Sequence, residues 1–132
     1  MTKQNLINYW KKQADLDFKT MEDMFKSKHY HWALFVGHLV VEKLLKALFV
    51  KIHSNNTPIP KIHNLYELAK RDNLQLSQEI SDKLDIITSF NIQARYQNEK
   101  ESFYKLCTKT YTAKWIKEIK EIKKWLKNLI SQ

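Results

Sequence analysis

The stretch His38-Leu-Val-Val-Glu-Lys-Leu-Leu-Lys-Ala-Leu48 places one acidic residue, Glu42, inside a strongly apolar segment. Spacings alternating between four and three residues predict one face of an α-helix, made of Leu34, His38, Val41, Leu45, Leu48 and Ile52. His38 and Glu42 are four residues apart, so their side chains stack along the edge of that face. Because a buried helix seldom keeps an acid beside its core without a partner, we expect Glu42 to meet Arg95 or His38.

Apolar stripes of this kind recur along the rest of the chain. They predict five helices, at about residues 3–27, 30–53, 64–72, 77–95 and 106–130, with the polar stretch 97–102 as a connection. Gly37 inside the second helix predicts that another helix crosses closely at that point. Because each stripe covers one face only, the helices must pack on one another. We therefore expect an all-α fold, an up-and-down bundle of about five helices.

The composition agrees with this fold class. One Gly and two Pro among 132 residues are too few for a turn-rich β architecture, and the length suits one domain spanning residues 1–132. The single cysteine, Cys107, cannot form an internal disulfide, which fits a reduced compartment. No signal peptide is recognisable at the start, and charges interrupt the most apolar stretch, 32–52. We expect a soluble cytoplasmic protein with no membrane partner.

The net charge of +9 is concentrated toward the end of the sequence, where residues 105–132 hold eight lysines and two glutamates. A basic helix of this kind is typical of proteins that contact a polyanion. The alternative is that these lysines only solubilise an exposed helix face. Only two of the 23 basic residues are arginines, the type best suited to bidentate phosphate contacts.

Three short motifs resemble the HEPN domain family in their order and spacing. They are Glu-Lys-Leu-Leu-Lys-Ala-Leu at 42–48, His63-Asn64-Leu65 after a Pro-containing loop, and Ala94-Arg95-Tyr96. The resemblance implies a helical bundle that forms a homodimer, with a groove lined by Glu42, Arg95, Tyr96 and His38. Stand-alone prokaryotic members are often paired with a minimal nucleotidyltransferase as toxin and antitoxin. The implied partners are therefore a nucleotide, RNA or a nucleotidyltransferase protein.

The same resemblance bears on catalysis. Family members that cleave RNA without a metal carry an Arg followed four to six residues later by a His. Here residues 96–102 contain no His, and none occurs after His63. General acid–base chemistry near neutral pH needs a group that titrates there, so we expect a binding module more than an enzyme. A degenerate ribonuclease using Arg95 with His38 or Glu42 is one alternative, and a plain helical scaffold for dimerisation is another.

Individual site candidates also have simpler interpretations. Arg95 lies at the predicted end of a helix, where it either caps the last carbonyls or holds a phosphate in the groove. Tyr96, with Phe103 and Tyr104, lies in the polar connection, where it either stacks on a base or seals a dimer seam. For His38 we favour a core-edge histidine that is hydrogen-bonded to Glu42.

We expect no metal and no cofactor. His29 and His31 are two residues apart at the start of a helix and point in different directions, and no other set of side chains has metal-ligand spacing. With a single Gly in the chain, a glycine-rich phosphate loop or a dinucleotide fingerprint is impossible.

Overall fold

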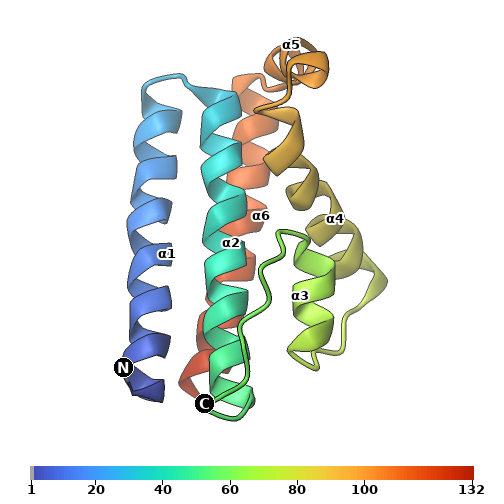
Figure 1. Cartoon of the computed structure of the whole chain (residues 1–132). Coiled ribbons are helices and arrows are strands. Elements are labelled where there is room, and N and C mark those ends of the chain that lie inside the picture. Colours follow the sequence, from blue (N-terminus) through green and yellow to red (C-terminus); the bar gives the residue numbers. More distant parts are fainter. Residues whose placement is uncertain (1) are drawn as a thin grey trace.

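The computed structural model describes residues 2–132, which form helices and connecting loops without any strand (Figure 1). The helices are α1 (Lys3–Lys26), α2 (Tyr30–Ile52), α3 (Leu65–Arg71), α4 (Gln78–Gln93), α5 (Gln97–Leu106) and α6 (Lys109–Ser131). This confirms the all-α fold class. The boundaries predicted from apolar periodicity agree with the observed ends to within about three residues for α1 to α4 and α6.

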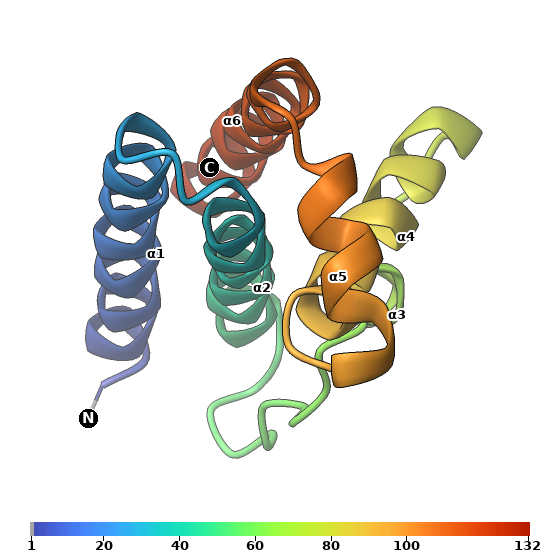
Figure 2. The ribbon, with the colours of Figure 1, turned by 90° about the horizontal axis from the view of Figure 1, so that it is seen from above.

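Helix α2 is the centre of the molecule and contacts each of the other helices. Figures 1 and 2 show α1 on one side of α2, α6 behind it, and α3, α4 and α5 on the remaining side. Helix α6 runs in the same direction as α2, because the three intervening helices return the chain to its starting end. Although α2 is the most apolar helix, none of the helices within residues 2–132 combines the length and apolarity needed to cross a membrane.

Gly37 marks the place where α1, α2 and α6 approach one another. A Cβ atom at this position would lie 2.5 Å from Ile119 Cδ1 of α6 and 3.1 Å from Met21 Sδ of α1. Both neighbours are fully buried. The close crossing predicted from this glycine is confirmed, and it positions the opposite side of α2 toward α3 and α4.

Several helices begin at a residue whose side chain accepts a hydrogen bond from the first turn. Thr2, Asn64, Ser77 and Thr108 act in this way for α1, α3, α4 and α6. Such caps satisfy backbone N–H groups that have no partner within the helix. The cap at Asn64 fixes the backbone directly after His63.

The prediction of a polar connection at 97–102 was wrong, because this segment belongs to α5. The helix is polar on most of its surface, so it lacks the long apolar stripe on which the prediction relied. Its anchor is one residue: Phe103 is only 1% exposed and packs on Phe90, with 5.6 Å between ring centroids. Phe103 is therefore a core residue, whereas Tyr96 and Tyr104 are exposed.

Candidate functional site

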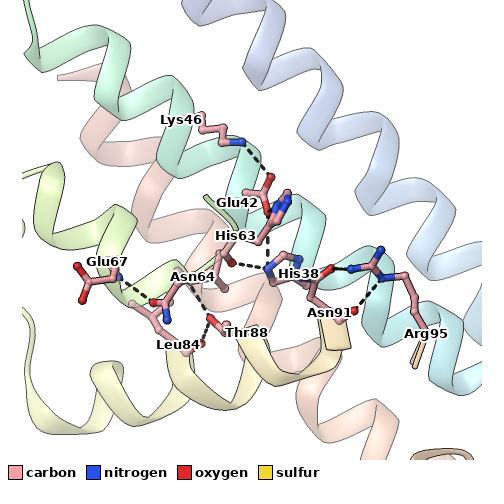
Figure 3. Close-up of polar contacts among 11 residues, drawn as sticks. His38, Glu42, Lys46, His63, Asn64, Glu67, Leu84, Thr88, Asn91 and Arg95 are labelled. Carbon is pink, nitrogen blue, oxygen red and sulfur yellow. Dashed lines mark hydrogen bonds and ion pairs between the residues drawn. The ribbon is translucent and has the colours of Figure 1, made fainter. Parts of the chain in front are cut away.

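Glu42 lies at the centre of a buried polar cluster where α2 meets the segment leading into α3 (Figure 3). Although its side chain projects from an apolar helix, it is satisfied on both oxygens. His63 Nδ1 donates to Oε1 at 2.9 Å, and Lys46 Nζ donates to Oε2 at 3.1 Å. His38 Nε2 lies 3.7 Å from Oε1, close to the carboxylate but beyond hydrogen-bond distance. The expectation that Glu42 has a polar partner is confirmed, and His38 is one of its neighbours.

Arg95 is not the partner of Glu42, contrary to the other leading expectation. It lies just beyond the end of α4, where Nε donates to the Asn91 carbonyl oxygen and Nη2 donates to Asn91 Oδ1, both at 2.9 Å. Because the backbone bond satisfies a carbonyl of the last helical turn, the capping interpretation describes part of its role. The separation from Glu42 follows from helix geometry, since a side chain held along its own helix axis cannot also reach into the core.

His38 is 0% exposed, and its Nε2 lies 2.8 Å from the His63 carbonyl oxygen. Because a carbonyl oxygen only accepts, Nε2 must carry the proton. Burial is the main cause that lowers the pKa of His38, and the nearby Arg95 charge lowers it further, against the raising effects of the His63 carbonyl and Glu42. A neutral His38 thus fixes the backbone of His63. The predicted hydrogen bond to Glu42 is not formed, because Oε1 lies 3.7 Å away.

His63 was missed as a site residue, although the sequence offered a signal in the His63-Asn64-Leu65 motif. Its ring is 62% exposed while Nδ1 is held by Glu42. The backbone on its C-terminal side is anchored as well, because Leu65 N donates to Thr88 Oγ1 and Glu67 N donates to Asn64 Oδ1. His63 is therefore an exposed imidazole in a fixed orientation. Lys46 could have been recognised in the sequence as a partner of Glu42, because it lies four residues further along the same helix.

The guanidinium of Arg95 also stacks against aromatic rings. Its Cζ lies 5.3 Å from the Phe35 ring centroid and 5.6 Å from that of Tyr96. Arg95 and Tyr96 are exposed, whereas Asn91 beneath them is buried. Within residues 2–132, the guanidinium forms its hydrogen bonds through Nε and Nη2 only, and Nη1 makes none. The result is an exposed cation with little freedom to rotate.

Figure 3 shows His38 between the Glu42–His63 pair and the Asn91–Arg95 pair. The structure thus joins Glu42, His38 and His63 in one network and places Arg95 with Tyr96 beside it. No group of three or more His, Cys, Asp or Glu side chains suited to a metal ion occurs within residues 2–132. Cys107 is buried, and burial raises the pKa of its thiol to about 12, so it stays protonated near neutral pH.

Comparisons with known proteins identify the family. The model of the HEPN domain matches residues 7–129. No curated protein sequence matches the chain significantly. Among solved structures, TT1696 from Thermus thermophilus is similar, with a TM-score of 0.77 at 14% identity, covering 93% of this chain and 97% of that one. At that identity the likeness concerns the fold alone. Since the family model spans nearly the whole sequence, the chain belongs to the HEPN domain family.

Proposed function

We propose that this HEPN domain binds a phosphate group of a nucleotide or RNA at Arg95, in a groove completed by a second copy of the chain. The observation that carries the proposal is the fixation of Arg95. Asn91 holds its guanidinium at two points and Phe35 and Tyr96 flank it, yet the side chain remains exposed. A preorganised guanidinium loses less entropy on binding phosphate than a mobile lysine does.

Exposed apolar side chains support the proposal that a second copy of the chain binds here. Four of them lie on α4, on α5 and at their ends: Ile86, Ile92, Tyr96 and Leu106. Apolar surface of this kind often marks an interface, and a two-fold axis beside Tyr96 would bring the two Arg95 side chains together. Sedimentation at micromolar concentration should give about twice the chain mass of 15.9 kDa. A monomer would leave Arg95 as a single-subunit site.

Membership of the HEPN family supports a protein partner as well, a minimal nucleotidyltransferase in a toxin–antitoxin pair. The proposal expects a small nucleotidyltransferase gene beside the gene of this chain, and its purified product should form a stable complex with the chain on size-exclusion chromatography. Separate elution of the two proteins at micromolar concentration would remove this part of the proposal without affecting phosphate binding at Arg95.

The phosphate site is tested by RNA binding across a salt series. Affinity should fall steeply with salt, because each neutralised phosphate releases counterions. Arg95→Ala should weaken binding about tenfold or more, as expected for a fixed guanidinium, and Lys120→Ala on the exposed face of α6 is the matched control with a smaller effect. Equal losses in both variants would mean that RNA contacts a diffuse positive surface and that Arg95 has no special role.

A second candidate, metal-independent RNA cleavage, is favoured by the pairing of His63 with Glu42. When Nδ1 donates to the carboxylate, Nε2 of the exposed ring is left as a proton acceptor, the arrangement that general bases use. His38 is too deeply buried for this role. Chelator-resistant cleavage of an RNA pool that disappears in both His63→Gln and Arg95→Ala would support it. Absence of cleavage at high protein concentration would leave binding as the function.

A further inference from the structure

A pocket of about 530 Å³ lies where the start of α2 meets α5, and it takes no part in the Glu42 cluster. Its lining residues are His31, Trp32, Lys100, Glu101 and Tyr104. The volume is in the range of small-molecule sites in proteins. Apart from Lys100 and Glu101, every lining side chain carries an aromatic ring, so the pocket offers flat surfaces together with one cation and one anion.

The His31 ring contacts both of the other rings that line the pocket. His31 is buried, and its ring centroid lies 5.0 Å from that of Trp32 and 5.3 Å from that of Tyr104. Tyr104 meets His31 edge-on at 72° and is itself 66% exposed. The fold gains little stability from a tyrosine ring that stays exposed in this position. Burial is the main cause that lowers the pKa of His31, and the charge of Lys100 lowers it further, so the His31 ring is uncharged near neutral pH.

Contacts between aromatic rings connect the pocket to Arg95. Lys100 Nζ lies 5.3 Å from the Trp32 ring centroid, at the edge of the pocket. On the other side, Trp32 packs edge-on against Phe35 with 5.9 Å between centroids, and Phe35 is the ring over which the Arg95 guanidinium lies. One phenyl ring therefore separates the proposed phosphate contact from the aromatic pocket. Two cations flanking a set of aromatic rings is the pattern of single-stranded nucleic acid sites.

We infer that the pocket of His31, Trp32, Lys100, Glu101 and Tyr104 holds an unpaired nucleobase by stacking, next to the phosphate bound at Arg95. This inference rests on the proposed function, because it names the class of ligand, a single-stranded RNA segment or a free nucleotide. Tyr104 and Trp32 supply the stacking faces, and Lys100 contacts the backbone phosphate of the same nucleotide. Stacking of this kind tolerates any base, since every base has a π-face.

The experiment separates base contacts from phosphate contacts by changing the RNA. Fluorescence anisotropy is measured with a labelled riboadenylate hexamer and with an abasic hexamer of the same backbone. Tyr104→Ala should weaken binding of the hexamer about 5- to 150-fold, the range for the loss of one stacked base, and leave the abasic chain unchanged. Tyr104→Phe should retain binding, because its ring still stacks. Tyr9→Ala, an exposed tyrosine on α1, is the matched control and should have no effect.

Failure of the pocket and failure of the phosphate site give different results. Arg95→Ala should weaken binding of both hexamers, whereas Tyr104→Ala should affect only the one with bases. Equal binding of the two hexamers by the unaltered protein would overturn the pocket inference while leaving Arg95 as a phosphate site. A change in sedimenting mass on Tyr104→Ala would overturn it too, because Tyr104 would then be a dimer contact. If neither hexamer binds at low salt, adenosine monophosphate is titrated by NMR. Binding lost in Tyr104→Ala then identifies a free nucleotide as the ligand, and no binding refutes the inference.

Discussion

Glu42 and Asp72 are both carboxylates buried within the same bundle, and their surroundings are opposite. Glu42 is 5% exposed and has three nitrogen atoms around it, from His63, Lys46 and His38. Asp72 is 3% exposed at the C-terminal cap of α3, and neither of its side-chain oxygens has a hydrogen-bond partner within residues 2–132. Burial alone raises the pKa of Asp72 to about 8.

The difference shows why burial by itself does not mark a functional carboxylate. An unpartnered buried acid avoids the cost of desolvation by keeping its proton, whereas a partnered one organises the groups around it. Glu42 orients an exposed imidazole and so connects the core to the surface. Asp72 has no such connection, and its perturbed pKa reports a local cost to stability. The following predictions test this contrast, beginning with the largest effect.

Glu42→Ala should destabilise the fold by about 3–5 kcal/mol, because it leaves the buried ammonium of Lys46 without its counter-charge. Glu42→Gln should cost less, about 1–2 kcal/mol, since an amide oxygen still accepts a hydrogen bond. Urea unfolding followed by circular dichroism measures both. Glu79→Ala, which removes an exposed ion pair with Lys83, is the matched control and should cost under about 1 kcal/mol. If Glu42→Ala matched that control, the cluster would have no structural role.

Asp72→Asn should stabilise the protein at pH 8 and above by ~2 kcal/mol or more, because the folded state no longer has to bury a charge. The folded pKa of about 8 lies above the ordinary aspartate pKa of 3.8, so the folded state binds the extra proton. Stability of the unaltered protein is thus highest at low pH with respect to this group. It falls by up to about 1.4 kcal/mol per pH unit as pH rises from 4 to 8.

The pH series itself distinguishes this explanation from a general gain in packing. Thermal unfolding of both proteins is followed at several pH values from 4 to 9. The two curves should converge near pH 4 and separate progressively toward pH 8. A constant difference between them at every pH would show that the charge of Asp72 is not the cause.

His63→Ala should cost about 1 kcal/mol, less than the loss of Glu42, because its ring is largely exposed and Lys46 still compensates the carboxylate. The backbone of residue 63 would keep its contact with His38, since that contact uses the carbonyl oxygen. Chemical denaturation compares the variant with Glu42→Ala. A loss as large as that of Glu42→Ala would mean that His63, and not Lys46, is the principal counter-group.

Helices with apolar side chains repeating at a helical period were predicted correctly from the sequence. A helix held in the core by a single buried residue was missed. Periodic apolar stripes placed α1 to α4 and α6, and Gly37 correctly predicted the close crossing. Helix α5 was missed because Phe103 is the only buried side chain among residues 98–106, and one buried ring produces no periodic signal.

The candidate site was predictable only within one helix. His38, Glu42 and Lys46 share a face of α2, so their contacts follow from spacing along the helix. His63 comes from a loop, and its approach to Glu42 depends on how α3 docks, which local patterns do not encode. Arg95 was one of two partners expected for Glu42, yet the carbonyl and amide oxygens of Asn91 lie nearer to it along its own helix. Arg95 therefore forms hydrogen bonds with the nearby Asn91 oxygens and no ion pair with the more distant Glu42 carboxylate.

The smallest expected effect concerns Asn73, directly after Asp72. A substitution there distinguishes the effect of backbone conformation on stability from the effect of the Asp72 charge at the end of α3. Asn73 has φ of 58°, in the left-handed region, and Leu74 N donates to Ala69 O to close the helix. Glycine adopts this conformation without strain but gains more freedom in the unfolded chain, so Asn73→Gly should change stability by only ~0.5 kcal/mol, in the stabilising direction. Because no ionisable group changes, the difference should be the same at pH 5 and pH 8 in thermal unfolding. A pH-dependent effect of Asn73→Gly would mean that the backbone at this turn controls the burial of Asp72, and the contrast with Glu42 would then be one of loop geometry as well as of missing partners.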